Sequence, residues 1–396
     1  MYLFIFITIT LSYFFWAFKL YGFSPRIFLL STLIYLLLFY DSLPYPISRS
    51  VILVLVSLIA IAINYNKKVF YGTFTNMYLL FLFILVFASL FSSFDIYNFY
   101  GYRKIYYFIT IVVFPLIAMY VFGYTIDKDF KWTSVLIIIG VALTVIKYSI
   151  LTNFQLVGLR GYALLKGLDV VIPSKNVGLG IIVCIICLLI YKLGMLGKVF
   201  TFFSLILFIV YMLYLEGRAT ILITTFCVIF VYIFNTLGVK KVNLIVVTSM
   251  LIGGIYLILN NIEFSEYRYS NFFQDESRVA LYKKSLEIIK ENFLVGKGIG
   301  QFDDSHEDLT SYPHNIIMEI FVELGIFITF FFIFIIFIFL FKAFTLKKYK
   351  VPIFIITLYF LLHAQFSGDI VVNSPFFVFL GITFKELDFQ YKGKIL

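Results

Sequence analysis

The feature that most limits the fold of this chain is a series of apolar runs, most of them long enough to cross a lipid bilayer as a helix. The hydrocarbon core of a bilayer is about 30 Å thick and needs about 20 residues of α-helix. By that measure the runs cover residues 2–18, 27–40, 50–65, 76–93, 105–126, 132–150, 176–196, 199–215, 219–237, 243–260, 314–341 and 352–370, with a shorter run at 374–384. We therefore predict an all-α polytopic membrane protein with about twelve or thirteen transmembrane helices.

The composition agrees with this prediction and argues against a soluble globular protein. Hydrophobic residues make up 62% of the chain and charged residues 13%, whereas soluble domains carry about 25% charged residues. The run at 2–18 has no basic segment before it and no small-residue cleavage site after it, so we read it as a retained helix. We expect one membrane domain over residues 1–396.

Basic residues alternate between successive loops, which predicts the orientation of the chain. One set of loops holds a large excess of lysine, including Lys240, Lys241, Lys347 and Lys348, and should be cytoplasmic. The long polar loop at 261–313 falls on the other, extracytoplasmic side. The net charge of +10 then comes mainly from the lysines of the cytoplasmic loops, which orient the chain in the membrane. We therefore expect no nucleic-acid partner. The N-terminus falls outside, or inside if one of the first two runs is re-entrant.

The loop at 261–313 contains an expected amphipathic helix at residues 277–293, which ends at three glycines, Gly296, Gly298 and Gly300. Its apolar stripe consists of Tyr282, Leu286, Ile289 and Phe293, and Arg278 lies on the same stripe one turn before Tyr282. An arginine in that position points toward the membrane domain. The alternative is a snorkelling side chain that covers apolar surface.

His314 and Asn315 stand at the start of the apolar run that follows this loop. Glu319 and Glu323 follow on roughly the same face, and ionisable residues inside a membrane span are functional hypotheses by default. The chain has only three histidines. We interpret His314 as a general base or a phosphate contact.

Further basic residues are predicted on the same outer side. Arg218 lies in a very short turn, where a headgroup anchor is the alternative role, and Arg160, Lys175 and Asn176 lie in another outer loop. Converging guanidinium and ammonium groups suggest a polyanion such as a diphosphate. We expect the loop to act as a lid that presents Arg278 and His314 toward Arg218 across a diphosphate-sized cavity.

A polar turn near the C-terminus and the three cysteines are further candidates for functional sites. Asp369 and Asn373 close the last outer turn and suggest, with His363, a polar cavity. The chain has three cysteines, Cys184, Cys187 and Cys227, and all lie inside apolar runs. No second pair or nearby histidine completes a metal site, so we expect neither a metal nor a disulfide.

Taken in order, these motifs resemble the bacterial O-antigen ligase and polymerase superfamily. The resemblance covers residues 155–330 best, and it rests on Arg160-Gly161, Ser174-Lys175-Asn176, Gly217-Arg218-Ala219, Ser277-Arg278 through Tyr282, Gly296-x-Gly298-x-Gly300-x-Phe302, and His314-Asn315 with Glu319, Glu323 and Gly325. The chain departs from the usual pattern at Tyr282, where a tryptophan is usual, and at Lys175, where a proline is usual.

The resemblance implies a metal-independent glycosyltransferase in the bacterial inner membrane, without a cofactor, whose active site faces the periplasm. Its donor is an undecaprenyl-diphosphate-linked oligosaccharide. The family's two diphosphate-binding arginines match Arg218 and Arg278, and its acceptor-side histidine matches His314. Substrate-binding roles are expected for Arg160, Lys175, Asn176, Tyr282, Asn315, Glu319 and Glu323. Membrane lipid and a chain-length regulator are the other expected partners.

The leading hypothesis is an O-antigen polymerase that joins oligosaccharide repeat units. The first alternative is an O-antigen ligase that transfers the glycan to lipid A-core. A different class of protein, a flippase for lipid-linked oligosaccharides, has a similar number of spans, but transporters place polar sites near the midplane and often carry internal repeats. Here the polar groups gather at one face, which favours the enzyme.

Overall fold

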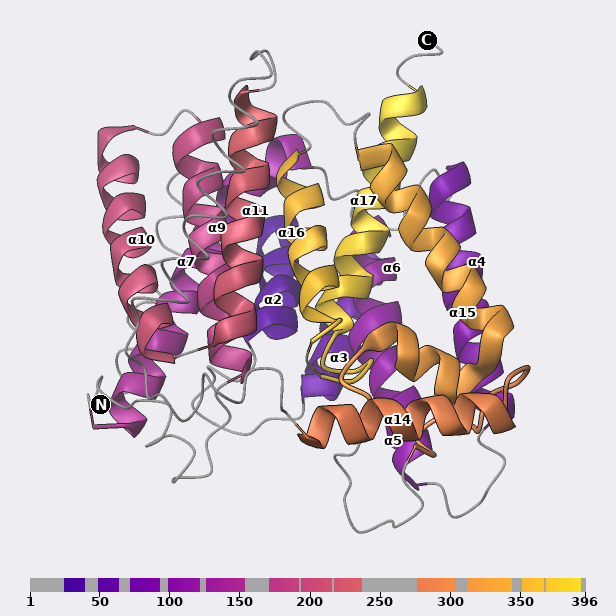
Figure 1. The fold of residues 1–396 in the computed structure, drawn as a ribbon. Helices are drawn as coiled ribbons and strands as arrows, with labels where there is room; N and C mark the ends of the chain where they lie inside the picture. Colours follow the sequence, from indigo (N-terminus) through magenta and orange to yellow (C-terminus); the bar gives the residue numbers. More distant parts are fainter. Residues whose placement is uncertain are drawn as a thin grey trace. The chain divides into compact units, whose positions relative to one another are not determined.

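The computed structural model of the chain shows helices and no strand among the residues that it describes (Figure 1). Those residues are 25–39, 49–63, 72–92, 99–121, 126–153, 171–191, 194–215, 217–236, 276–302, 312–343, 351–366 and 368–392. Every predicted apolar run within these ranges overlaps an observed helix, and the runs at 2–18 and 243–260 lie outside them. The prediction of an all-α fold is confirmed.

Among the described residues, 6 helices are long and apolar enough to cross a membrane. They are Thr73–Phe91, Tyr100–Val121, Thr133–Leu151, Val171–Ile190, Gly197–Leu215 and Ile316–Lys342. Shorter apolar helices occupy Arg49–Ala62, Ala219–Ile233 and Pro352–His363. The protein is therefore a multi-pass membrane protein, while the total of twelve or thirteen spans stays a prediction.

The chain divides into two compact units. Unit 1 comprises the described parts of Met1–Val69, Phe114–Leu237 and Lys347–Tyr359, and unit 2 those of Phe70–Val113, Gly238–Leu346 and Phe360–Leu396. The helix α16 (Val351–His363) begins in unit 1 and ends in unit 2.

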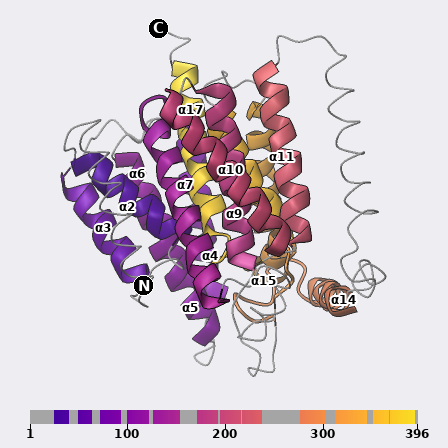
Figure 2. The same ribbon diagram turned by 90° about the vertical axis from the view of Figure 1, so that its left-hand side faces the viewer.

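Unit 1 is built around one buried helix, α9. Its helices are α2 (Pro25–Phe39), α3 (Arg49–Ile63), α6 (Phe114–Val121), α7 (Ile126–Leu151), α9 (Val171–Ile190), α10 (Met195–Leu215) and α11 (Arg218–Thr236). α9 packs against α7, α10 and α11 (Figures 1 and 2). A Cβ atom on Gly180 would lie 2.8 Å from the ring of Phe208. Glycine at this position lets α9 and α10 approach closely, as small residues do in membrane bundles.

Unit 2 combines upright helices with one helix that lies across them. It contains α4 (Thr73–Ser92), α5 (Phe99–Phe108), the π-helical turn η3 (Ile109–Val113), α14 (Glu276–Glu291), α15 (Ile316–Ala343) and α17 (Ser374–Lys392). α17 packs against α4, η3 and α15. α14 runs crosswise to α17 in Figure 1 and is seen nearly end-on in Figure 2.

The helix predicted at residues 277–293 is present as α14, and its predicted apolar stripe packs in part. Ile288 and Ile289 are buried in a cluster with Phe302 and Val322, whereas Leu286 is 53% exposed. The packed face therefore shares Ile289 with the predicted stripe and leaves out Leu286. The amphipathic, lid-like role of the loop stays a prediction, and residues 261–275 and 303–311 lie outside the described ranges.

One end of unit 2 is closed by a carboxylate that caps a distant helix. Asp388 of α17 accepts hydrogen bonds from the backbone N–H groups of Phe74 (3.0 Å) and Thr75 (2.7 Å) and from the Thr75 hydroxyl (2.6 Å). A side-chain oxygen at a helix start satisfies N–H groups that have no partner within the helix. The start of α4 and the C-terminal part of α17 therefore lie together.

Candidate active site at the broken helix α15

The apolar run at 314–341 was predicted as one continuous helix, and this is wrong. α15 is broken at Gly325, where the backbone angles are φ 75 and ψ −176, and Figure 1 shows its sharp bend. Residues 316–324 form a short half-helix, and residues 326–343 form the longer part. A glycine in the middle of a helical run is a known breaking signal, although hydrophobicity alone gives no sign of the bend.

The turn that follows α14 fills the break. The N–H groups of Lys297 and Gly298 donate to the carbonyls of Val322 (2.7 Å) and Glu323 (3.1 Å), and the N–H of Ile326 donates to the Phe293 carbonyl (3.0 Å). Backbone groups freed by a break inside a membrane need partners from the protein. The loop after α14 supplies them, so α14 and the half-helix 316–324 form one connected structure.

Two glycines make this close approach possible. Gly296 and Gly325 both have positive φ, a conformation that L-residues other than glycine rarely adopt. A Cβ on Gly296 would lie 2.5 Å from the Glu323 carbonyl oxygen, and one on Gly325 would lie 2.5 Å from the Leu294 carbonyl carbon. Backbone therefore packs directly on backbone here.

His314 lies directly before the N-cap of the half-helix and has a strained backbone conformation. Its φ is 55, and its ring lies 4.4 Å from the ring of Tyr312. A non-glycine residue in this region persists only where its surroundings fix it, and such residues cluster at functional sites. Asn315 accepts hydrogen bonds from the N–H groups of Ile317 (3.0 Å) and Met318 (3.1 Å), which caps the half-helix directly after His314.

Glu319 and Glu323 share one buried cation, Lys104 of α5. The Lys104 ammonium group donates to Glu319 and, at 2.5 Å, to Glu323. The Glu319 carboxylate also accepts the Ile370 N–H (3.2 Å), and the Glu323 carboxylate accepts the Gly300 N–H (2.9 Å). The two glutamates thus connect α15 to α5 and to two turns; a direct role in substrate binding stays a prediction.

This cluster is buried and incompletely satisfied. Lys104 is 2% exposed and Glu319 is 1% exposed, and the Glu319 Oε2 atom has no hydrogen-bond partner among the described residues. Burying charges is costly unless they are paired and hydrogen-bonded. Two buried carboxylates against one ammonium group therefore keep the functional interpretation of these glutamates as a hypothesis.

Lys104 is the site residue that the sequence did not reveal. The predicted span began at residue 105, which left Lys104 in the preceding outer loop, whereas the helix begins at Phe99. A single lysine at the edge of an apolar run gives only a weak signal. Its partners are 215 and 219 residues away in the chain, so no local pattern could have identified them.

Asp369 and Asn373 organise their own turn. Asp369 accepts hydrogen bonds from the N–H groups of Val371 (3.1 Å) and Val372 (2.9 Å), and the Asn373 amide donates to the Asp369 carbonyl (3.0 Å). The Tyr100 hydroxyl donates to the other Asp369 oxygen at 3.1 Å. The turn is therefore fixed beside the Lys104 cluster.

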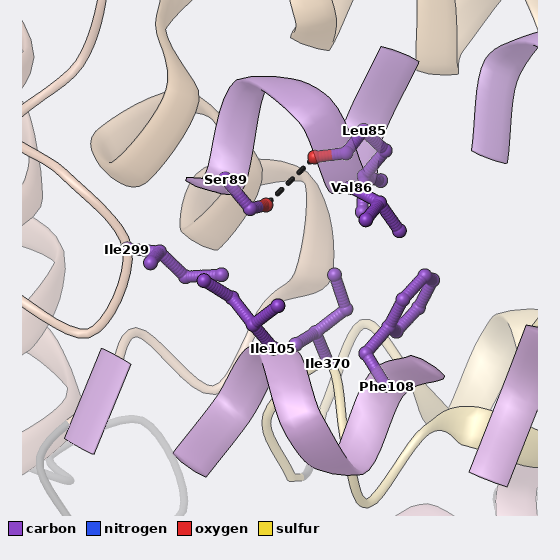
Figure 3. Close-up of a pocket in the computed structure, with 7 residues that line it drawn as sticks. All are labelled: Leu85, Val86, Ser89, Ile105, Phe108, Ile299 and Ile370. Atoms are coloured by element: carbon purple, nitrogen blue, oxygen red, sulfur yellow. Dashed lines mark hydrogen bonds between the residues drawn. The ribbon is translucent and has the colours of Figure 1, made fainter. Parts of the chain in front are cut away.

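A small cavity next to this turn is apolar (Figure 3). Its volume is about 10 Å³ and it is lined by residues that include Ile105, Phe108, Ile299 and Ile370. The Ser89 hydroxyl is turned to the Leu85 carbonyl at 2.7 Å. A cavity needs roughly 10–15 Å³ and several polar partners to hold one water molecule. This cavity therefore differs from the polar cavity expected near Asp369.

The structure also describes several of the other predicted residues. Lys175 and Asn176 are buried in α9 of unit 1, where the Tyr359 hydroxyl donates to the Lys175 carbonyl at 2.6 Å. Arg218 is the first residue of α11. In unit 2, Tyr282 is half-buried in α14.

Other parts of the prediction fall outside what the structure describes: residue Arg160 and the side chains of Arg218 and Arg278. The pairing of Arg218 with Arg278 and His314 stays a prediction. The three cysteines are free and buried. In the described ranges, no three His, Cys, Asp or Glu side chains are grouped to hold a metal ion; metal independence remains an expectation.

Comparison with known proteins supports the resemblance that the motifs indicated. None of the curated proteins compared with the chain matches it. Residues 174–333 match the family model described as O-antigen ligase, and this segment contains Arg218, α14, His314 and both glutamates of the Lys104 cluster. Over these residues the chain is similar to the O-antigen ligase family, which supports its place in the superfamily of O-antigen ligases and polymerases.

Proposed function

We propose that this protein is an O-antigen polymerase that joins undecaprenyl-diphosphate-linked oligosaccharide repeat units at the periplasmic face of the inner membrane. The observation that carries the proposal is the strained backbone of His314, at the mouth of a broken membrane helix inside the segment that matches O-antigen ligase. Strain of this kind is maintained at functional sites. A chain-length regulator is the partner expected in addition to lipid.

The chemistry needs three things from the protein. It must hold the diphosphate with cations, place an acceptor hydroxyl in line with the anomeric carbon, and take a proton. We assign the first to Arg218 and Arg278 and the last to His314. The acceptor oxygen bonds to the anomeric carbon as the bond to the diphosphate oxygen breaks. The bonding electrons leave with the lipid diphosphate, and the hydroxyl proton goes to His314.

The second candidate is an O-antigen ligase, which the description of the matching family favours. The same residues would serve both reactions, because only the acceptor differs: a second lipid-linked repeat unit in a polymerase and lipid A-core in a ligase. Deleting the gene and analysing the surface glycan separates them. Single repeats that remain attached to core indicate the polymerase, whereas bare core with accumulated lipid-linked polymer indicates the ligase.

Single substitutions test the assigned residues. We expect His314→Ala and Arg278→Ala to abolish long glycan chains while the protein still accumulates in the membrane. Lys283→Ala is a matched control for Arg278→Ala, because Lys283 is an exposed cation on the same helix. Normal glycan length in both test variants would refute the assignment.

A further inference from the structure

Lys104 has no part in the chemistry assigned above, yet it is the shared partner of both carboxylates on the half-helix 316–324. It comes from α5, far from that segment in the chain, and its side chain is 2% exposed. A buried ammonium group between two buried carboxylates restricts all three side chains, because none can move without leaving an unpaired charge.

Each carboxylate also holds one turn of the backbone. Glu319 accepts the Ile370 N–H at 3.2 Å, and Glu323 accepts the Gly300 N–H at 2.9 Å. Both bonds use the oxygen that binds Lys104. Lys104 therefore lies where α5, the half-helix and two turns are joined.

The half-helix determines where His314 lies. The Glu319 N–H donates to the Asn315 carbonyl at 2.9 Å, and the Ile316 N–H donates to the Ala364 carbonyl at 3.0 Å. His314 directly precedes these bonds with a φ of 55. A strained residue keeps its geometry only when its neighbours are fixed, so a shift of the half-helix is transmitted to the His314 ring.

We propose that Lys104 is a positioning residue for His314: by binding Glu319 and Glu323 it locks the half-helix 316–324 against the turns at Gly300 and Ile370. The inference rests on the proposed function, in which His314 takes the acceptor proton. Without the ammonium group, two carboxylates one helical turn apart repel each other and admit water. The half-helix then shifts, and His314 leaves the line of proton transfer.

The test uses the full-length protein in lipid nanodiscs and a polyprenyl-diphosphate-linked oligosaccharide as donor. We expect Lys104→Met to lower kcat about 100-fold, the loss that a misplacement of about 1 Å can cause. The donor KM should change less than about threefold, because the groups assigned to the diphosphate are untouched. If Lys104→Met does not accumulate in the membrane, Lys104→Arg carries the test. It keeps a positive charge between Glu319 and Glu323, but its larger planar guanidinium group cannot reproduce the geometry of the ammonium group, so kcat should still fall.

Asp388→Asn is the matched control, because Asp388 is also buried and joins helices at the other end of unit 2. It should leave kcat per folded molecule unchanged. A second measurement follows the imidazole signals of ¹³C-histidine-labelled protein, in which the His314 signal is assigned with His314→Gln. The Lys104 variants should shift or broaden that signal, and Asp388→Asn should not.

The two measurements separate the possible failures. An unchanged kcat, or a lower kcat with an unchanged His314 signal, would overturn the positioning role of Lys104. A shifted His314 signal in a protein whose wild type transfers no glycan would leave the positioning role intact and refute the proposed function. A wild type without transfer and an unchanged signal would refute both.

Discussion

The two ends of unit 2 both bury carboxylates, and they satisfy them in different ways. At the Asp388 end, formed by the start of α4 and the C-terminal part of α17, both Asp388 oxygens accept hydrogen bonds from Phe74 and Thr75. At the Lys104 end, formed by Lys104 with Glu319 and Glu323, an ammonium group holds both carboxylates and one Glu319 oxygen has no partner among the described residues.

The Asp388 end is explained by the fold alone, whereas the Lys104 end fits the functional role proposed for it. A fully satisfied cap is an ordinary way to start a helix, and it needs no explanation beyond the fold. Incompletely satisfied buried charge is costly and is retained mainly at functional sites. The Lys104 end also contains the broken helix α15 and the strained His314, whereas the contacts described at the Asp388 end are regular.

The largest effect is expected from Lys104→Ala, which leaves two buried carboxylates without their cation. Removing one partner of a buried charge pair costs about 3–5 kcal/mol. We expect the free energy of unfolding, measured by titration with SDS in mixed micelles, to fall by that amount. Adding Glu319→Gln and Glu323→Gln should recover most of the loss. A free energy of unfolding for Lys104→Ala equal to that of the wild type would show that the charges at the Lys104 end are no more costly to disturb than the helix cap at the Asp388 end.

A smaller loss is expected from Gly325→Ala, which tests the break in α15. The backbone conformation alone, φ 75 and ψ −176, costs about 1–3 kcal/mol for a residue with a side chain, and the new Cβ would lie 2.5 Å from the Leu294 carbonyl carbon. The midpoint of thermal denaturation in detergent should fall clearly. Gly194→Ala is the control, because a Cβ there meets no atom within 4 Å. Equal losses in the two variants would contradict the close approach.

At the other end, Asp388→Ala should cost about 1–2 kcal/mol, the usual range for a lost helix cap. The same SDS titration measures it. Glycan chains made by the folded fraction should keep their length, because the start of α4 has no role in the proposed reaction. A loss of unfolding free energy larger than that of Lys104→Ala would contradict the expectation that buried charge is more costly to disturb at the Lys104 end.

The smallest effects are expected from two single hydroxyl deletions, one beside the Lys104 cluster and one between α4 and the first turn of α17. Tyr100→Phe removes a hydrogen bond of 3.1 Å to Asp369, and Tyr78→Phe removes one of 2.6 Å to the Phe377 carbonyl. Each should cost about 0.5–1.5 kcal/mol. Only Tyr100→Phe should also shorten the glycan chains, because it loosens the turn that Glu319 holds. Shorter glycan chains in Tyr78→Phe and normal chains in Tyr100→Phe would contradict the role of the Lys104 end in the proposed reaction.

Much of the fold could be predicted because the length of an apolar run is a local property. The observed helices follow the predicted runs closely, and the helix at α14 appears where its spacing indicated. The packed face of α14 could be predicted in part. Ile289 belongs to the predicted stripe, whereas Ile288 lies beside it and is buried by contact with Phe302 and Val322.

The candidate site was predicted in part. His314, Asn315, Glu319 and Glu323 were singled out because polar residues are rare and expensive in an apolar run. The strain at His314 and the break at Gly325 went unpredicted, because backbone angles depend on what packs against them. Lys104 was counted only as an outer basic residue.

The lengths of the apolar runs are enough to identify an all-helical membrane protein with a polar segment before His314, because the thickness of the bilayer fixes the length of a membrane-spanning helix. They do not reveal which buried charges pair with one another, and these pairs are visible only in the folded chain. Lys104 and Glu319 are 215 residues apart, and Thr75 and Asp388 are 313 apart. A charge inside a membrane protein must find a partner in space, and its neighbours in the chain do not reveal which partner that is.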